Sequence, residues 1–154
     1  MKLLLWSDSV CALTGFGRVA RTICGALSDE WEITQVGLNH PGLDAEDDRV
    51  KIHAAPSDDP VGVNLAKELY LTQDYDLFIV IQDLHIMNPW AGPFATMRAT
   101  RQLRNEKRTP VLYHFPVDGP MLGDAEFCRF ADYNVSCTQW GVEALAPLLP
   151  ITSI

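Results

Sequence analysis

The sequence predicts an α/β domain with a doubly wound, mostly parallel β-sheet, and three observations support this. Segments with the pattern of strands and of helices alternate from one end of the chain to the other. Residues 77–81 are an unbroken apolar run, typical of a parallel strand buried on both faces. Polar or glycine-containing segments follow the predicted strands. Such alternation favours βαβ units with right-handed crossovers, and therefore a Rossmann-like sheet with helices on both faces.

The amino-terminal half predicts three strands and two helices, placed by the period of their apolar residues. The first strand is a short apolar run, and the helix after it carries Val19, Ile23 and Leu27 on one face. The second strand alternates apolar and polar side chains, and the short third strand is expected near an edge of the sheet. In chain order these elements are a strand over 2–6, a helix over 17–27, strands over 31–38 and 50–54, and a helix over 61–71.

The carboxyl-terminal half predicts three more strands and three more helices. Pro93 opens one of these helices, because a proline in the first turn removes an amide that has no partner there. Pro116 ends the strand that precedes it. In chain order the elements are a strand over 77–81, a helix over 93–105, a strand over 111–115, a helix over 124–131, a strand over 133–137 and a helix over 139–148.

Length and composition restrict the function. The 154 residues suit a single domain, and residues 151–154 look like the start of a further strand, so we expect one half of a larger protein. The net charge of −8 argues against nucleic-acid binding, which needs a basic face. With no signal peptide and no membrane-spanning run, the chain is expected to be cytoplasmic. Its four cysteines lack metal-ligand spacing, which indicates reduced thiols and no bound metal: Cys11, Cys24, Cys128 and Cys137.

A phosphate-binding loop is predicted where the first strand meets the first helix. Two glycines, Gly15 and Gly17, allow the backbone to approach a ligand closely. The helix that follows directs free amides and the positive end of its dipole into the same space, and phosphate is the usual ligand of such a site. The alternative is a glycine loop that only turns the chain. The predicted phosphate loop comprises Thr14, Gly15, Phe16, Gly17 and Arg18.

The same loop formally matches the dinucleotide-binding pattern of two glycines followed by a small residue, here Ala20. The connection from the strand to the glycines is too long for that fold, in which the chain turns tightly. The second strand also ends in Leu38, Asn39 and His40, with no acidic residue to bind a ribose. A nicotinamide or flavin cofactor is therefore not expected.

Polar residues at the ends of two predicted strands are expected to line a cleft, since ligands bind at the carboxyl ends of parallel strands. Ser7 and Asp8 follow the first strand, and Asp83 and His85 follow the central one. Asp83 and His85 have the chemistry to bind sugar hydroxyls or to form an acid–base pair. The alternative is that Asp83 begins a helix. The sequence leaves both interpretations open.

Two further candidates lie at the end of the strand over 111–115. Asp118 follows it in a loop stiffened by prolines, which suits a catalytic or substrate-orienting carboxylate. His114 lies inside the strand pattern, where a hydrogen-bonded core histidine is the alternative to a catalytic one.

A basic stripe marks the helix over 93–105 and the residues after it. The stripe is interpreted as a solvated face, with contact to a membrane surface or an anionic acceptor as the alternative. Its members are Arg98, Arg101, Arg104, Lys107 and Arg108.

Several of these motifs, in this order and spacing, resemble the N-terminal half of glycosyltransferases with the GT-B fold. The most similar group is the retaining, glycogen-synthase-like family 4. The resemblance runs across nearly the whole chain and rests on SDS at 7–9, TGFGRV at 14–19, IQD at 81–83, YHFPVDG at 113–119, AD at 131–132 and TQWG at 138–141.

The resemblance implies an acceptor-side domain that is inactive without a C-terminal, donor-binding GT-B domain, which this chain does not contain. It implies a nucleotide sugar, a UDP- or GDP-sugar, as donor, a sugar or glycan as acceptor, and no bound metal. The loop around Gly15 would lie near the donor diphosphate, and Asp118, or His114, near the anomeric carbon. Two alternatives stay open: a stand-alone nucleotide- or phosphosugar-binding module, and a non-enzymatic interaction protein of a phage or mobile element.

Overall fold

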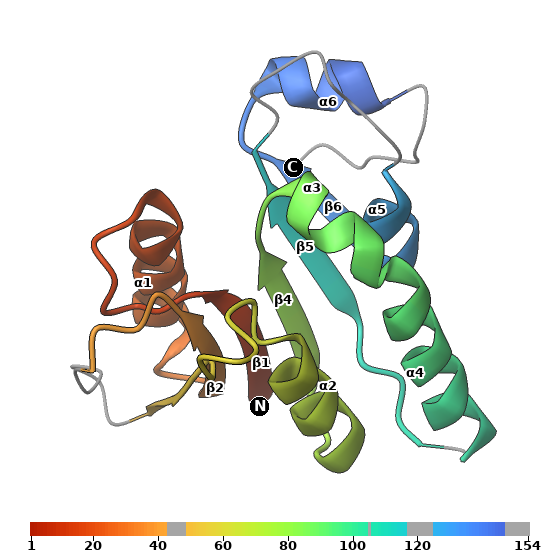
Figure 1. The fold of residues 1–154 in the computed structure, drawn as a ribbon, viewed down its shortest axis with the longest axis horizontal. Helices are drawn as coiled ribbons and strands as arrows, with labels where there is room; N and C mark the ends of the chain where they lie inside the picture. The colour runs from red at the N-terminus through yellow and green to blue at the C-terminus, as the bar shows by residue number, and fades with distance from the viewer. Residues whose placement is uncertain (43–48, 105, 117–124, 147–154) are drawn as a thin grey trace.

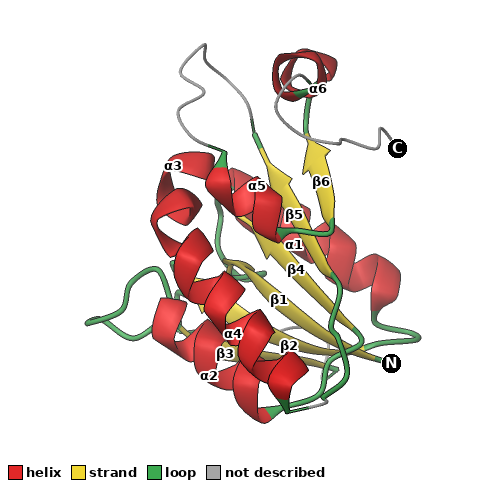
Figure 2. Cartoon of the chain, turned by 90° about the vertical axis from the view of Figure 1, so that its right-hand side faces the viewer, coloured by secondary structure: helices red, strands yellow, loops and turns green. Residues whose placement is uncertain are grey.

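The computed structural model describes residues 1–42, 49–104, 106–116 and 125–146. Within these ranges the chain forms a six-stranded parallel sheet in the order β3-β2-β1-β4-β5-β6. Helix α1 covers one face, and α2, α4 and α5 cover the other (Figures 1 and 2). The winding direction reverses between β1 and β4, which is the arrangement of a Rossmann-like fold. The predicted doubly wound α/β architecture is confirmed, and the sheet is parallel throughout.

The strands lie close to the predicted positions. β1 is two residues longer than expected, because Ser7 and Asp8 continue the ladder opposite Gly37 and Leu38 of β2. β3 lies at one edge of the sheet, as predicted, and β6 at the other. The strands are β1 (Lys2–Asp8), β2 (Glu32–Leu38), β3 (Val50–Ala54), β4 (Leu77–Ile81), β5 (Val111–Phe115) and β6 (Tyr133–Ser136).

The helices differ from the prediction at several ends. α4 spans Ala91–Leu103, so Pro93 is its third residue and does not open the helix as predicted. α2 (Val63–Thr72) begins two residues later than predicted, and α5 (Glu126–Phe130) is shorter than predicted at both ends. α1 begins two residues early, because the Thr14 hydroxyl accepts a hydrogen bond from the Gly17 amide and caps the helix. The segment after β4 contains a short helix and a 3-10 turn, which the sequence did not predict. The elements are α1 (Gly15–Leu27), α2 (Val63–Thr72), α3 (Leu84–Met87), η1 (Asn88–Trp90), α4 (Ala91–Leu103), α5 (Glu126–Phe130) and α6 (Gln139–Leu145).

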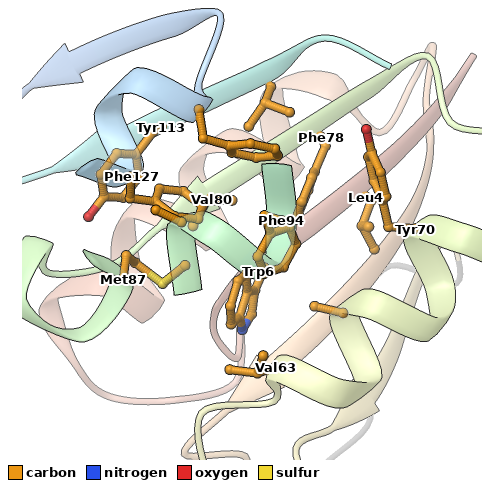
Figure 3. Close-up of a cluster of buried hydrophobic side chains, with 14 of the residues drawn as sticks. Leu4, Trp6, Val63, Tyr70, Phe78, Val80, Met87, Phe94, Tyr113 and Phe127 are labelled. Carbon is orange, nitrogen blue, oxygen red and sulfur yellow. The ribbon is translucent and has the colours of Figure 1, made fainter. Parts of the chain in front are cut away.

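A hydrophobic core lies on each face of the sheet. β1 serves both, because alternate side chains point to opposite faces: Leu4 and Trp6 to one, Leu3 and Leu5 to the other. The larger core, beneath α2, α4 and α5, is rich in aromatic rings (Figure 3). There Trp6 stacks on Phe94 with ring centroids 5.4 Å apart. The smaller core lies beneath α1.

Two of the five members of the basic stripe, Arg98 and Arg101, are built into the fold, whereas the other three are exposed. Arg101 is buried and pairs with the Asp74 carboxylate at 2.5 Å, and Arg98 pairs with Asp132 at 2.6 Å. The predicted solvated face is therefore wrong for these two arginines, which join α4 to neighbouring elements. The other described pairs are Arg101 and Arg104 with Glu106, Lys107 with Asp76 and Arg108 with Asp132. None of the helices in the described ranges combines the length and apolar character needed to cross a membrane.

Candidate ligand-binding site

The carboxyl end of β1 is held by hydrogen bonds within the protein. Asp8 is only 4% exposed. Its Oδ2 accepts from the Thr14 hydroxyl at 2.5 Å, and its Oδ1 accepts from the Asn39 side-chain amide at 3.0 Å. The Ser7 hydroxyl is fully buried and donates to the Asp8 carbonyl at 2.7 Å. Ser7 and Asp8 therefore fix the loop after β1, and their predicted role at an acceptor cleft stays a prediction.

Gln35 of β2 completes this network, and sequence reasoning missed it. Its side-chain nitrogen donates to the Asp8 carbonyl and to the Ser7 hydroxyl, each at 2.9 Å. Its side-chain oxygen accepts from the Val10 amide at 3.1 Å. The available signal was a polar residue at one of the apolar positions of the alternating strand, since a fully buried amide needs partners.

The two glycines of the predicted phosphate loop play different roles. A Cβ atom on Gly17 would lie 2.5 Å from the Ala12 carbonyl oxygen and 2.9 Å from that of Ser9, so only glycine lets α1 approach the preceding loop this closely. A Cβ on Gly15 would meet no atom within 4 Å. Gly17 is thus a packing requirement, whereas Gly15 borders open space.

The first turn of α1 retains two backbone donors. The Gly17 amide donates to the Thr14 hydroxyl at 3.0 Å, and the Arg18 amide donates to the Thr14 carbonyl at 3.1 Å. No described residue accepts a hydrogen bond from the amides of Gly15 or Phe16. The Arg18 side chain is exposed. The start of this 13-residue helix therefore offers two amides, a helix dipole and a nearby cation to an anion.

A pocket of about 350 Å³ joins the start of α1 to the carboxyl ends of β5 and β6. It brings His114 together with part of the predicted phosphate loop. Val19 and Cys137 were not predicted to belong to a site. Cys137 could have been predicted as a site residue because it directly follows β6. Ligands bind at the carboxyl ends of parallel strands, and the same argument selected residues after β1 and β4. The pocket is lined by Thr14, Gly15, Phe16, Val19, His114 and Cys137.

His114 and Cys137 are the polar pair of this pocket. The Cys137 sulfur lies 3.6 Å from His114 Nε2. The buried His114 Nδ1 has no hydrogen-bond partner among the described residues. Burial lowers the pKa of His114, and burial raises the pKa of the Cys137 thiol. At neutral pH the pair is therefore an uncharged imidazole beside an uncharged thiol.

The other predicted site residues lie elsewhere. Asp83 takes the N-cap position of α3, in agreement with the helix-start alternative, and His85 is exposed in the same short helix. Neither lines the pocket. Asp118 lies outside the described residues. Thr14 lines the pocket, but its hydroxyl is already bonded to Asp8 and to the Gly17 amide.

The arrangement suits a ligand that has both an anionic and an uncharged part. Among the described residues, no group of three or more histidine, cysteine or acidic side chains is placed to hold a metal ion. No protein-family model matches this chain, and no curated protein matches its sequence.

Proposed function

We propose that this chain is the acceptor-side, N-terminal domain of a retaining GT-B glycosyltransferase that uses a UDP- or GDP-sugar as donor. The observation that carries the proposal is the pocket shared by the start of α1 and His114 of β5. It lies at the carboxyl ends of parallel strands, where Rossmann-like sheets bind ligands. Five of its six described lining residues belong to two of the motifs on which the resemblance to family 4 rests, and Cys137 belongs to none of them.

The start of α1 is proposed to bind the donor diphosphate. The amides of Gly15 and Phe16, which have no acceptor among the described residues, and the positive end of the α1 dipole all favour an anion. Arg18 adds a positive charge in the same turn. These groups would stabilise the negative charge that develops on the leaving nucleoside diphosphate. This chemistry requires no metal ion.

His114 is proposed to hold the reacting hydroxyl of the acceptor. Because burial lowers the pKa of its imidazole, the ring is neutral at pH 7 and keeps one nitrogen that accepts a hydrogen bond. Asp118, or His114, is proposed to lie near the anomeric carbon, as the resemblance implies. A C-terminal GT-B domain would supply most of the donor site, so the 154 residues are expected to bind nucleotide sugars without transferring the sugar.

Titration calorimetry of the 154-residue chain with UDP- and GDP-sugars tests the proposal. The informative variant is Gly15→Asp, because a side chain at Gly15 meets open space and its carboxylate would repel a bound phosphate. We expect about tenfold weaker binding of the nucleotide sugar, which corresponds to about 1.4 kcal/mol. We also expect a slightly more stable fold, since a negative charge at a helix N-terminus is favourable.

Gly25→Asp is the matched control, because Gly25 lies in the same helix and its Cβ would also meet open space. It adds the same charge near the other end of α1, so the affinity is expected to change less than twofold. The proposal would be overturned if no UDP- or GDP-sugar bound, or if Gly15→Asp and Gly25→Asp lost the same affinity for the nucleotide sugar.

A stand-alone nucleotide- or phosphosugar-binding module is the second candidate, since the unpartnered amides and the pocket would serve it equally. The two candidates differ in one outcome. A binding module would not transfer sugar when a donor-binding GT-B domain is supplied, whereas the acceptor-side domain would.

A further inference from the structure

We infer that the pocket beside His114 receives an uncharged, apolar part of the acceptor, and therefore that the acceptor is a hydroxyl-bearing aromatic or branched aliphatic compound and not a glycan. This inference rests on the proposed function, because it assumes that the pocket is the acceptor side of a glycosyltransferase. It departs from the sugar or glycan acceptor that the resemblance implies.

The composition of the pocket wall is the first argument. Among the described residues that line it, none is Lys, Arg, Asp or Glu. Phe16 and Val19 contribute apolar side chains, and Gly15 contributes no side chain. The one hydroxyl among these described residues belongs to Thr14, which already donates to Asp8 and accepts from the Gly17 amide. The wall is therefore apolar in character.

The polar side-chain groups of this described wall are too few for the hydroxyls of a sugar ring, since the backbone amides of Gly15 and Phe16 are assigned above to the donor diphosphate. Each sugar hydroxyl that leaves water without a new partner costs about 1–3 kcal/mol. Among the described side chains of the wall, the His114 imidazole is the one neutral ring that can accept a hydrogen bond. Its Nδ1 is buried, so the contact with the acceptor hydroxyl is assigned to Nε2, which lies 3.6 Å from the Cys137 sulfur. One such group suits a ligand with a single hydroxyl on an apolar body.

The charge state of the wall also favours an uncharged, apolar ligand. Burial lowers the pKa of His114 and raises the pKa of Cys137, so neither side chain is charged at neutral pH. A volume of about 350 Å³ lies at the small end of the range for ligand pockets, which is about 300–1,000 Å³. A pocket of this size suits a compact apolar group, such as one or two fused rings, with its hydroxyl directed at His114.

Protection of Cys137 from alkylation measures occupancy of the pocket. Cys137 is exposed, whereas Cys24 and Cys128 are buried and serve as internal references in a mass-spectrometric assay with N-ethylmaleimide. Naphthol is the apolar probe, and methyl glucoside is the polar one. We expect saturating naphthol to slow alkylation of Cys137 at least fivefold, and methyl glucoside to leave the rate unchanged. Protection by the glucoside and not by naphthol, or by neither, would overturn the inference.

Two variants at one position test the polarity of the wall without changing its charge. Cys137→Asn and Cys137→Val are similar in size, and the exposed position makes misfolding of either unexpected. Because an unpaired amide in an apolar pocket costs about 1–3 kcal/mol, naphthol is expected to bind Cys137→Asn about tenfold more weakly than Cys137→Val. Fluorescence titration gives both affinities. Equal affinities, or tighter binding to Cys137→Asn, would contradict an apolar site.

The two proposals fail in different ways. If UDP- or GDP-sugars bind and respond to Gly15→Asp but naphthol does not occupy the pocket, the apolar acceptor is wrong and the glycosyltransferase proposal stands. If naphthol binds as expected and no UDP- or GDP-sugar does, the proposed function is wrong.

Discussion

The end of β1 and the ends of β5 and β6 differ in how their polar groups are used. At the end of β1, both carboxylate oxygens of Asp8 accept hydrogen bonds, and the Thr14 hydroxyl both donates and accepts. At the end of β5, the buried Nδ1 of His114 has no described partner, and the exposed Cys137 lies beside the same ring. A position at a strand end does not by itself make a side chain available to a ligand.

Neighbouring structure explains the difference. β1 lies at the centre of the sheet, and the loop after it folds back against α1 so closely that Gly17 has no room for a side chain. Backbone buried in this way needs internal partners, which Asp8 and Gln35 supply. β6 is an edge strand, and among the described residues fewer hydrogen-bond partners lie at the ends of β5 and β6 than at the end of β1.

The two glycines of the loop should respond very differently to the same substitution. Gly17→Val is expected to lower the free energy of unfolding by about 3 kcal/mol, because its Cβ would meet two backbone carbonyl oxygens that cannot move cheaply. Gly15→Val is expected to change it by less than about 0.5 kcal/mol, because the space is open. Urea unfolding measures both, and similar losses would show that the closely packed loop extends to Gly15.

Two threonines cap helices in the same way but in the two different regions. Thr14 and Thr138 each accept a hydrogen bond from an amide three residues later, at 3.0 Å in both cases. Thr138→Ala is expected to cost about 1 kcal/mol of stability, the usual value of a cap. Thr14→Ala is expected to cost about 2 kcal/mol, because buried Asp8 also loses a donor. Equal losses in thermal or urea unfolding would argue against a special role for Asp8.

The smallest expected effect is a pH dependence that comes from His114. Burial holds the pKa of its imidazole below the ordinary value of 6.5, so the unfolded chain takes up the proton first as the pH falls. The stability is therefore fully present above about pH 6.5 and decreases as the pH falls from there towards 5. His114→Asn should reduce this slope in urea unfolding at pH 7 and 5.

His53 is the internal reference for that measurement. Burial and the nearby Lys51 also lower the pKa of His53, so it adds a slope of the same sign that His114→Asn leaves in place. Cys137, which faces His114, stays protonated in this range because burial raises the pKa of its thiol. An unchanged slope in His114→Asn would mean that the imidazole is better solvated than its burial indicates.

Much of the fold could be predicted because its signals are local. The apolar run of β4 and the four-residue apolar steps of α1 each follow from a short stretch of sequence. α3 and η1 were missed because a helix of one turn carries no period. Arg101 was expected in solvent, since the sequence could not indicate that Asp74 and the carbonyls of α2 lie beside it.

The candidate site was predicted less completely. The sequence placed the glycine loop and His114 at the same edge of the sheet, but not in one pocket. The sequence predicts only that Cys137 is a reduced thiol. Its contact with His114 depends on β5 and β6 lying side by side, which the spacing of cysteines cannot indicate. Gln35 was overlooked because its partners, Asp8 and Val10, lie more than 20 residues away.

By itself, the sequence determined the α/β class, the positions of the six described strands and the glycine-led start of α1, because hydrophobic period and turn chemistry act over a few residues. The folded arrangement set which polar groups are hydrogen-bonded within the protein and which, like His114 Nδ1, have no described partner. Hydrogen bonding and burial depend on neighbours that the order of the strands brings together, and among the described residues the end of β1 has more of them than the end of β6.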